Sequence, residues 1–299
     1  MWQVILFSIF LGLMASLKAY FQGRYAKKYV KNNFDTSRLI FLSFLLSTLI
    51  ILPFVIAKNQ WSIDAVKYGL LAGLFSFIYQ IFYTLAFKKG PLSLTVLINS
   101  LFMLFPILFS VFFYKESFTL LRIIGTCLIV ISFILNTKKD PHNKTSLSWL
   151  FLATLMMAFH ALINIAMKYF SLSTTGGKEI YGFVLFMYIS TTILSLIYLL
   201  FIKFKNRKDK ENKYNIFISP GKPLIFTSLF LAIDMAVYDL VDIYATGNFD
   251  GPLYFPLNSG LMLIFSIGIA IFINKEKLSW LQYLAFAMAI AAIIVLSIN

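Results

Sequence analysis

Apolar residues fill this chain in ten long runs separated by short polar segments. A helix needs about 20 apolar residues to cross the hydrocarbon core of a bilayer, and most of the runs are near that length. The runs are Gln3–Phe21, Leu39–Ala57, Tyr68–Phe87, Leu92–Tyr114, Leu120–Leu135, Leu147–Tyr169, Tyr181–Ile202, Pro223–Ala245, Leu253–Ile273 and Leu278–Ile298. The pattern predicts an all-α membrane protein with ten transmembrane helices.

One stretch of the sequence occurs twice. Residues 90–116 read GPLSLTVLINSLFMLFPILFSVFFYKE, and residues 251–276 read GPLYFPLNSGLMLIFSIGIAIFINKE. Both copies begin with Gly-Pro-Leu, contain Asn-Ser and end with Lys-Glu, and their matching positions are 159 to 161 residues apart. An internal repeat defines the architecture before any motif is considered. We therefore predict a first five-helix repeat at residues 1–136, a linker at 137–146 and a second five-helix repeat at 147–299.

The odd number of spans in each repeat has a consequence for topology. When a five-helix unit is duplicated within one chain, its second copy enters the membrane from the opposite side. The two copies are then inverted repeats, related by a pseudo-two-fold axis in the membrane plane. This arrangement is typical of secondary transporters, whose substrate site lies near the midplane between the repeats.

Composition supports membrane insertion. Of the 299 residues, 60% are hydrophobic and 13% are charged, and the mean hydropathy is +0.84. A soluble domain is closer to half apolar and a quarter charged. In so apolar a chain, the net charge of +14 indicates loops that face a membrane surface, not binding to nucleic acid. Cys127 is the only cysteine, which excludes an internal disulfide and a cysteine-based metal site.

Acidic residues in the eighth span are the clearest candidates for function. An Asp at the centre of a membrane helix costs about 2.5–3.5 kcal/mol on insertion scales, so such residues usually face a cavity or a partner. One helix face carries Thr227, Leu231, Asp234, Tyr238, Val241 and Asp242. We expect Asp234 to bind a cationic group, a proton or sodium; the alternative is that it only holds helices together. For Asp242, and for Asp239, which we expect to point away from this face, the structural role is favoured.

Further polar residues in the spans are candidates for the walls of a cavity. Tyr79, Tyr83 and Tyr238 could form an aromatic pocket for an ammonium group together with Asp234. Polar contacts would come from His160, Asn164, Asn99 and Asn258. An interhelical hydrogen bond explains His160 and Asn164 equally well, and close helix packing is the favoured explanation for Asn99 and Asn258. Lys18 and Lys168 occupy equivalent places in the two repeats, and we expect both to extend toward the membrane surface.

Motifs for catalysis are absent from the sequence. It contains no P-loop, no Rossmann glycine pattern, no nucleophile elbow and no HExxH. We therefore expect neither an enzyme nor a protein with a cofactor or metal.

The chain resembles the drug/metabolite transporter (DMT) superfamily, EamA type. The resemblance rests on Gly90-Pro91, Lys115-Glu116 and Gly125 in the first repeat, and on Gly251-Pro252 and Lys275-Glu276 in the second. Two departures occur in the second copy: Ala285 or Ala287 stands where the first has Gly125, and no proline matches Pro106. The resemblance implies a carrier with a central cavity lined by spans one, three, four, six, eight and nine. Members of the superfamily move amino acids, nucleotide sugars and choline-like amines.

Two lines of reasoning disagree on orientation. The loops after spans one, three, five, seven and nine carry 19 Lys and Arg residues, against six in the other loops and the span ends next to them. The positive-inside rule then places both termini outside the cytoplasm, whereas the resemblance implies that both are inside. The orientation is left open.

These observations predict a secondary active transporter in the cytoplasmic membrane of a prokaryote. Its substrate would be a small polar metabolite with an amine group, choline-like or an amino acid, moved by alternating access and coupled to exchange or to a proton or sodium gradient. One alternative is a proton-coupled exporter of neutral or aromatic amino acids, with Asp234 as the proton site. Another is a flippase for a lipid-linked solute. The direction of transport and the oligomeric state stay open.

Overall fold

The computed structural model describes residues 2–90, 92–135, 146–173, 178–205, 221–273 and 279–298, and within these ranges it contains helices and no strand. The helices are α1 (Trp2–Tyr29), α2 (Asn33–Lys58), α3 (Ile63–Lys89), α4 (Leu92–Ser100), the 3-10 helix η1 (Leu101–Met103), α5 (Leu104–Tyr114), α6 (Leu120–Leu135), α7 (Leu147–Ser171), α8 (Ile180–Lys205), α9 (Lys222–Asn248), α10 (Gly251–Phe272) and α11 (Trp280–Ser297). Most of the predicted linker, and the junction at Lys275-Glu276, lie outside the described residues.

These elements confirm the ten predicted spans. Eight of the described helices are each long and apolar enough to cross a membrane, and α6 is a shorter apolar helix. The fourth span is formed by α4, η1 and α5 together. Pro106 explains the interruption, because it has no N–H to donate to the carbonyl of Phe102 and so weakens the helix one turn earlier. The tighter η1 turn lies at this position.

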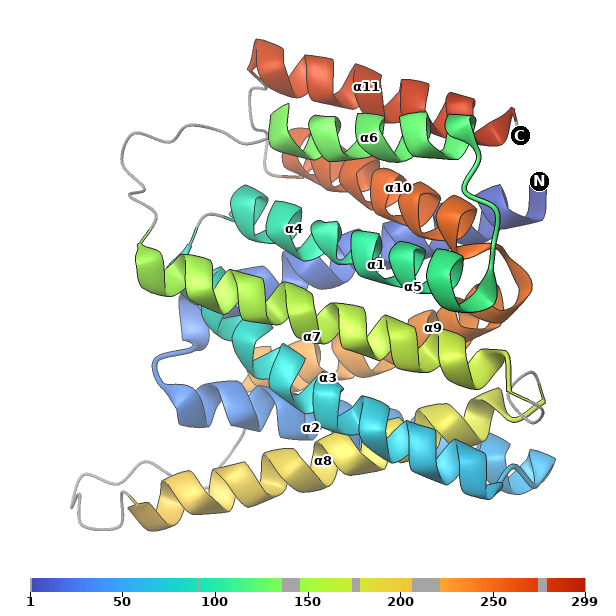
Figure 1. The fold of residues 1–299 in the computed structure, drawn as a ribbon. Coiled ribbons are helices and arrows are strands. Elements are labelled where there is room, and N and C mark those ends of the chain that lie inside the picture. The colour runs from blue at the N-terminus through green and yellow to red at the C-terminus, as the bar shows by residue number, and fades with distance from the viewer. Residues whose placement is uncertain are drawn as a thin grey trace.

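Contacts between helices show the inverted symmetry of the two repeats (Figure 1). In the first repeat α3 packs against α7 and α8, and in the second its counterpart α9 packs against α1 and α2. Likewise α1 packs against α10, as α7 packs against α4 and α5. The paired helices α6 and α11 form one side of the bundle, and α2 and α8 lie on the opposite side. The two described chain ends lie at the same end of the bundle, as an even number of spans requires.

Helix boundaries follow from local capping. The side chain of Asn32 accepts a hydrogen bond from the Asp35 amide, and the Asn32 amide donates one to the Asp35 carboxylate, which forms a capping box at the start of α2. The hydroxyls of Ser62 and Ser146 cap α3 and α7, each by accepting one hydrogen bond from a backbone amide in the first turn of its helix. Asn59, with φ of 51°, ends α2 in the left-handed conformation.

Small residues bring α3 and α8 into close contact. Gly69 and Gly73 lie one turn apart on the face of α3 that touches α8. The Thr191 hydroxyl donates to the carbonyl of Gly73 at 2.9 Å, and the Ser190 hydroxyl donates to the carbonyl of Leu70 at 3.0 Å. Small residues allow such backbone approach in membranes, where packing and interhelical hydrogen bonds replace the hydrophobic effect between helices.

Candidate functional site: a central polar cavity

A cavity lies between the two repeats at the middle of the bundle. Its volume is about 70 Å³, which is below the usual range of small-molecule sites. Side chains reach it from α1, α3, α4, η1, α7, α9 and α10, together with Phe44 of α2 and Met187 of α8. All six spans that the resemblance implied contribute to the lining.

Seven of the eight residues proposed from the sequence line this cavity: Tyr79, Tyr83, Asn99, His160, Asn164, Tyr238 and Asn258. They come from five different helices, which the fold brings together at one depth. The eighth residue, Asp234, is not part of the lining.

The cavity face of α9 is formed by Met235, Tyr238, Asp239 and Asp242. Their spacing of three, one and three residues is that of a single helix face. Our expectation that Asp239 points away from this region was therefore wrong. Adjacent residues of a helix are about 100° apart, so a modest rotation of α9 decides which row of residues faces the cavity. Packing of α9 against α1 and α2 sets that rotation.

Each of the two cavity-facing carboxylates accepts a hydrogen bond from a tyrosine. The Tyr188 hydroxyl donates to Oδ2 of Asp239 at 2.8 Å, and the Tyr254 hydroxyl donates to Oδ1 of Asp242. A carboxylate has about four acceptor sites, so a single phenol leaves most of that capacity for a further donor. The tyrosines orient the two acids.

Lys18 contributes a cation to the same cavity. We expected Lys18 and Lys168 to extend toward the membrane surface, and neither does. Lys168 is only 1% exposed and forms an ion pair with Glu116. Lys18 is partly buried in the cavity wall. The cavity thus contains an ammonium group from α1 and two carboxylates from α9.

Aromatic rings and amides complete the walls. The His160 ring lies between Phe102 and Tyr79, with centroid distances of 3.8 and 4.8 Å, and its Nδ1 is 3.2 Å from Oδ1 of Asn99. The rings of Tyr79 and Tyr83 are 5.3 Å apart. This stack presents ring surfaces and amide groups to the cavity from α3, α4 and α7.

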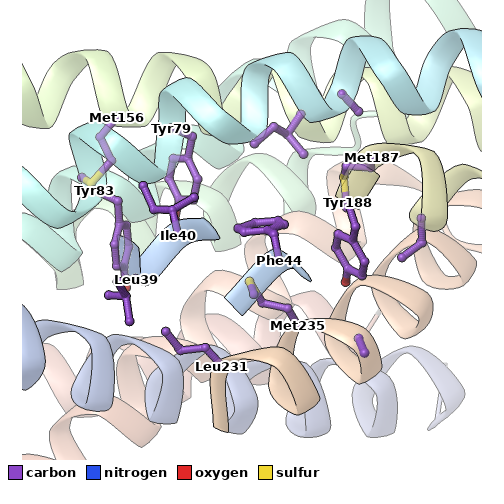
Figure 2. Close-up of a cluster of buried hydrophobic side chains, with 14 of the residues drawn as sticks. Leu39, Ile40, Phe44, Tyr79, Tyr83, Met156, Met187, Tyr188, Leu231 and Met235 are labelled. Carbon is purple, nitrogen blue, oxygen red and sulfur yellow. The ribbon is translucent and has the colours of Figure 1, made fainter. Parts of the chain in front are cut away.

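An apolar cluster supports the cavity from the side of α2. Figure 2 shows Phe44 beside Met235, with Met187 nearby and Tyr79 and Tyr83 to the left of Phe44 in the view. Methionine side chains are flexible and polarisable and adapt to ligands of different shape. Phe44, Met187 and Met235 therefore form an adaptable apolar side of the cavity, next to the acidic residues of α9.

Asp234 has a separate environment. Its side chain is 1% exposed, and neither carboxylate oxygen has a hydrogen-bond partner among the described residues. A buried ionised carboxylate without a partner is strongly disfavoured. The neutral, protonated form is the one that this environment accommodates.

Sequence reasoning missed Lys18 and Asp239 as cavity residues. A signal for Asp239 existed, since it lies one position after Tyr238 and three before Asp242. No sequence signal pointed to Lys18, because it lies less than one turn before the end of the first apolar run; α1 continues about three turns beyond it, to Tyr29. Among the described residues no group of three or more His, Cys, Asp and Glu is placed to bind a metal ion.

The fold and the cavity together define a class of protein: an integral membrane protein built from inverted repeats around a central polar cavity. Residues 6–138 match the model of the EamA-like transporter family, part of the DMT superfamily, which confirms the resemblance seen in the sequence. Members of the family are transporters and not enzymes. No curated protein matches the chain. A solved crystal structure aligns with 97% of this chain and with 96% of its own chain, at a TM-score of 0.70 and 15% sequence identity. This similarity shows a shared fold.

Proposed function

We propose that this transporter moves a small polar metabolite with an amine group by alternating access. The observation that carries the proposal is the pair of carboxylates, Asp239 and Asp242, facing one cavity between the repeats. An intramembrane acid is expensive and usually functional, and two acids on one face attract a cation. The membrane would be the cytoplasmic membrane of a prokaryote.

The walls of the cavity suit an ammonium ligand. Tyr79, Tyr83 and Tyr238 line it, and aromatic faces attract ammonium groups by cation–π interaction. Lys18 lies in the same cavity and would bind an anionic group, which favours an amino acid over a choline-like amine. Asn99, Asn164, Asn258 and His160 would supply hydrogen bonds that orient the substrate.

A thermal-shift screen of the purified protein tests this proposal. A ligand that binds only the folded state stabilises it, by about 2.7 kcal/mol at 100 times Kd. We expect amino acids to raise the melting temperature more than choline-like amines, and nucleotide sugars to have no effect. Stabilisation by nucleotide sugars alone, or by lipid-linked solutes alone, would contradict an amine substrate.

The environment of Asp234 favours a role in proton coupling. Its oxygens have no hydrogen-bond partner among the described residues, and it lies outside the cavity lining. Lys18 of α1, Tyr83 of α3, Tyr188 of α8 and Asp239 of its own helix are the charged or titratable groups that interact with it electrostatically. A carboxyl group that prefers its proton when buried would take it up or release it as water gains access. This supports the alternative of a proton-coupled amino acid exporter.

Asp234→Asn separates coupling from substrate binding. Asparagine keeps the shape of the protonated acid but cannot release a proton. We expect the variant in proteoliposomes to retain substrate exchange within about twofold while losing accumulation driven by a pH gradient, a loss of an order of magnitude or more. Equal loss of exchange and of accumulation would assign Asp234 to structure or to substrate binding. Unchanged accumulation would place the proton site elsewhere.

A further inference from the structure

A polar network joins the two repeats at the end of the bundle where the chain termini lie. Its centre is an ion pair between Glu116, which follows α5, and Lys168 in the last turn of α7. Nζ of Lys168 is 2.7 Å from Oε1 of Glu116, and the two side chains are 1% and 14% exposed. The pair is therefore almost completely enclosed by protein.

Both partners make a second contact with the same connection, between α9 and α10. Nζ of Lys168 donates to the carbonyl of Phe249 at 3.1 Å. The Gly251 amide, in the first turn of α10, donates to Oε2 of Glu116 at 2.6 Å. A carboxylate at a helix N-terminus is stabilised by the free amides and by the helix dipole. One carboxylate of the first repeat thus binds two separate elements of the second.

The repeated motif explains why Glu116 is at this position. Lys115, with φ of 56°, ends α5 in the left-handed conformation, and the amides of Lys115 and Glu116 donate to the carbonyl of Ser110. This turn directs the chain toward α10. The start of α10 lies close to α5, because a Cβ added at Gly251 would be 2.4 Å from Oγ of Ser110. The Lys-Glu end of one copy therefore meets the Gly-Pro start of the other.

The network lies next to the cavity along two helices. On α7, Asn164 lines the cavity and Lys168 follows one turn later; on α10, Gly251 precedes the cavity residue Asn258 by two turns. The network is thus stacked on the terminus side of the cavity. The two equivalent lysines differ, since Lys168 is paired while Lys18 of the first repeat lines the cavity.

We propose that Glu116, Lys168 and the Gly251 amide form a latch that closes the cavity on the terminus side. A buried ion pair is stable when closed, and its separation is strongly unfavourable unless water solvates both charges. When this end of the protein opens, water reaches both charges and solvates them. The closed and the fully open states are therefore stable, and partly open states are unfavourable. This two-state behaviour is what alternating access requires of a gate. The latch rests on the alternating access proposed above, but it would serve any substrate and does not depend on an amine.

Cysteine accessibility tests the latch directly. Ser259→Cys places a thiol in the cavity, and Cys127→Ser removes the native, exposed cysteine. In vesicles of each orientation, a membrane-impermeant thiol reagent is applied from the terminus side. Glu116→Gln keeps the acceptor oxygen for Gly251 but removes the charge. We expect this variant to raise the rate of modification from the terminus side at least tenfold.

Two further variants keep the test decisive. If Glu116→Gln fails to fold because Lys168 is left unpaired, the double variant Glu116→Leu with Lys168→Met removes both charges, and the same tenfold increase is expected. Asp250→Asn is the matched control: it breaks the ion pair with Arg122, at 2.9 Å, which joins the same two repeats but in which Asp250 is 50% exposed. An unchanged rate in both latch variants, or an equal increase in Asp250→Asn, would overturn the latch. Failure of amines to bind would overturn the proposed substrate and leave this result unaffected.

Discussion

Replacing both Asp239 and Asp242 by asparagine is expected to lower the affinity for the amine substrate by a factor on the order of 10² or more. Removing one partner of a buried, hydrogen-bonded charge pair costs about 2–5 kcal/mol, and each 1.4 kcal/mol corresponds to a factor of ten in Kd. The asparagine oxygens still accept hydrogen bonds from Tyr188 and Tyr254, so the supporting contacts are kept. Isothermal titration calorimetry of the purified variant with the ligand from the screen measures the effect.

Asp250→Asn serves as the control for these two substitutions. Asp250 also belongs to the connection between α9 and α10, but its side chain is 50% exposed and lies outside the cavity lining. We expect the Asp250→Asn variant to bind the ligand with a Kd within about twofold of the wild-type value, because surface ion pairs contribute little. If the double variant binds the ligand as tightly as the wild type, the two acids do not form the amine site. Loss of binding in the control as well would indicate a general defect in folding.

The second large effect is expected at Gly73, where substitution by alanine should destabilise the protein by about 1–3 kcal/mol, as for other overpacked sites. A Cβ at this position would be 2.4 Å from the Met187 carbonyl and 2.5 Å from Cβ of Ser190. Both contacts involve atoms close to the backbone of α8, which cannot turn aside as the end of a flexible side chain does. The helices must separate, and the hydrogen bond from Thr191 to Gly73 is weakened. The melting temperature in detergent measures the loss.

Gly268→Ala is the matched control, since Gly268 also lies inside a helix but a Cβ there would meet nothing within 4 Å. Alanine is favoured over glycine in a helix by up to about 1 kcal/mol, so this variant is expected to melt at the same temperature as the wild type or slightly higher. Equal melting temperatures for Gly73→Ala and the wild type would show that α3 and α8 can separate without cost.

The architecture could be predicted because its signals are local or repeated along the chain. Apolar runs long enough to cross a bilayer indicate spans wherever they occur, and the duplicated Gly-Pro-Leu and Lys-Glu motifs reveal the inverted repeats. Tyr79, Tyr83, His160 and Asn164 could be chosen because polar side chains are rare inside such runs. Once the spans are known, these residues must lie at membrane depth.

The tertiary structure decided which charges face the cavity and which are paired. On α9 the rotation of the helix against α1 and α2 places Asp239 on the cavity and Asp234 outside its lining. Lys168 and Lys18 have equivalent places in the sequence, yet only Lys168 lies beside Glu116. Hydrophobic length determines that a helix spans the membrane, but its rotation depends on packing with helices distant in sequence. The partner of each buried charge is therefore a property of the assembled bundle and not of any single span.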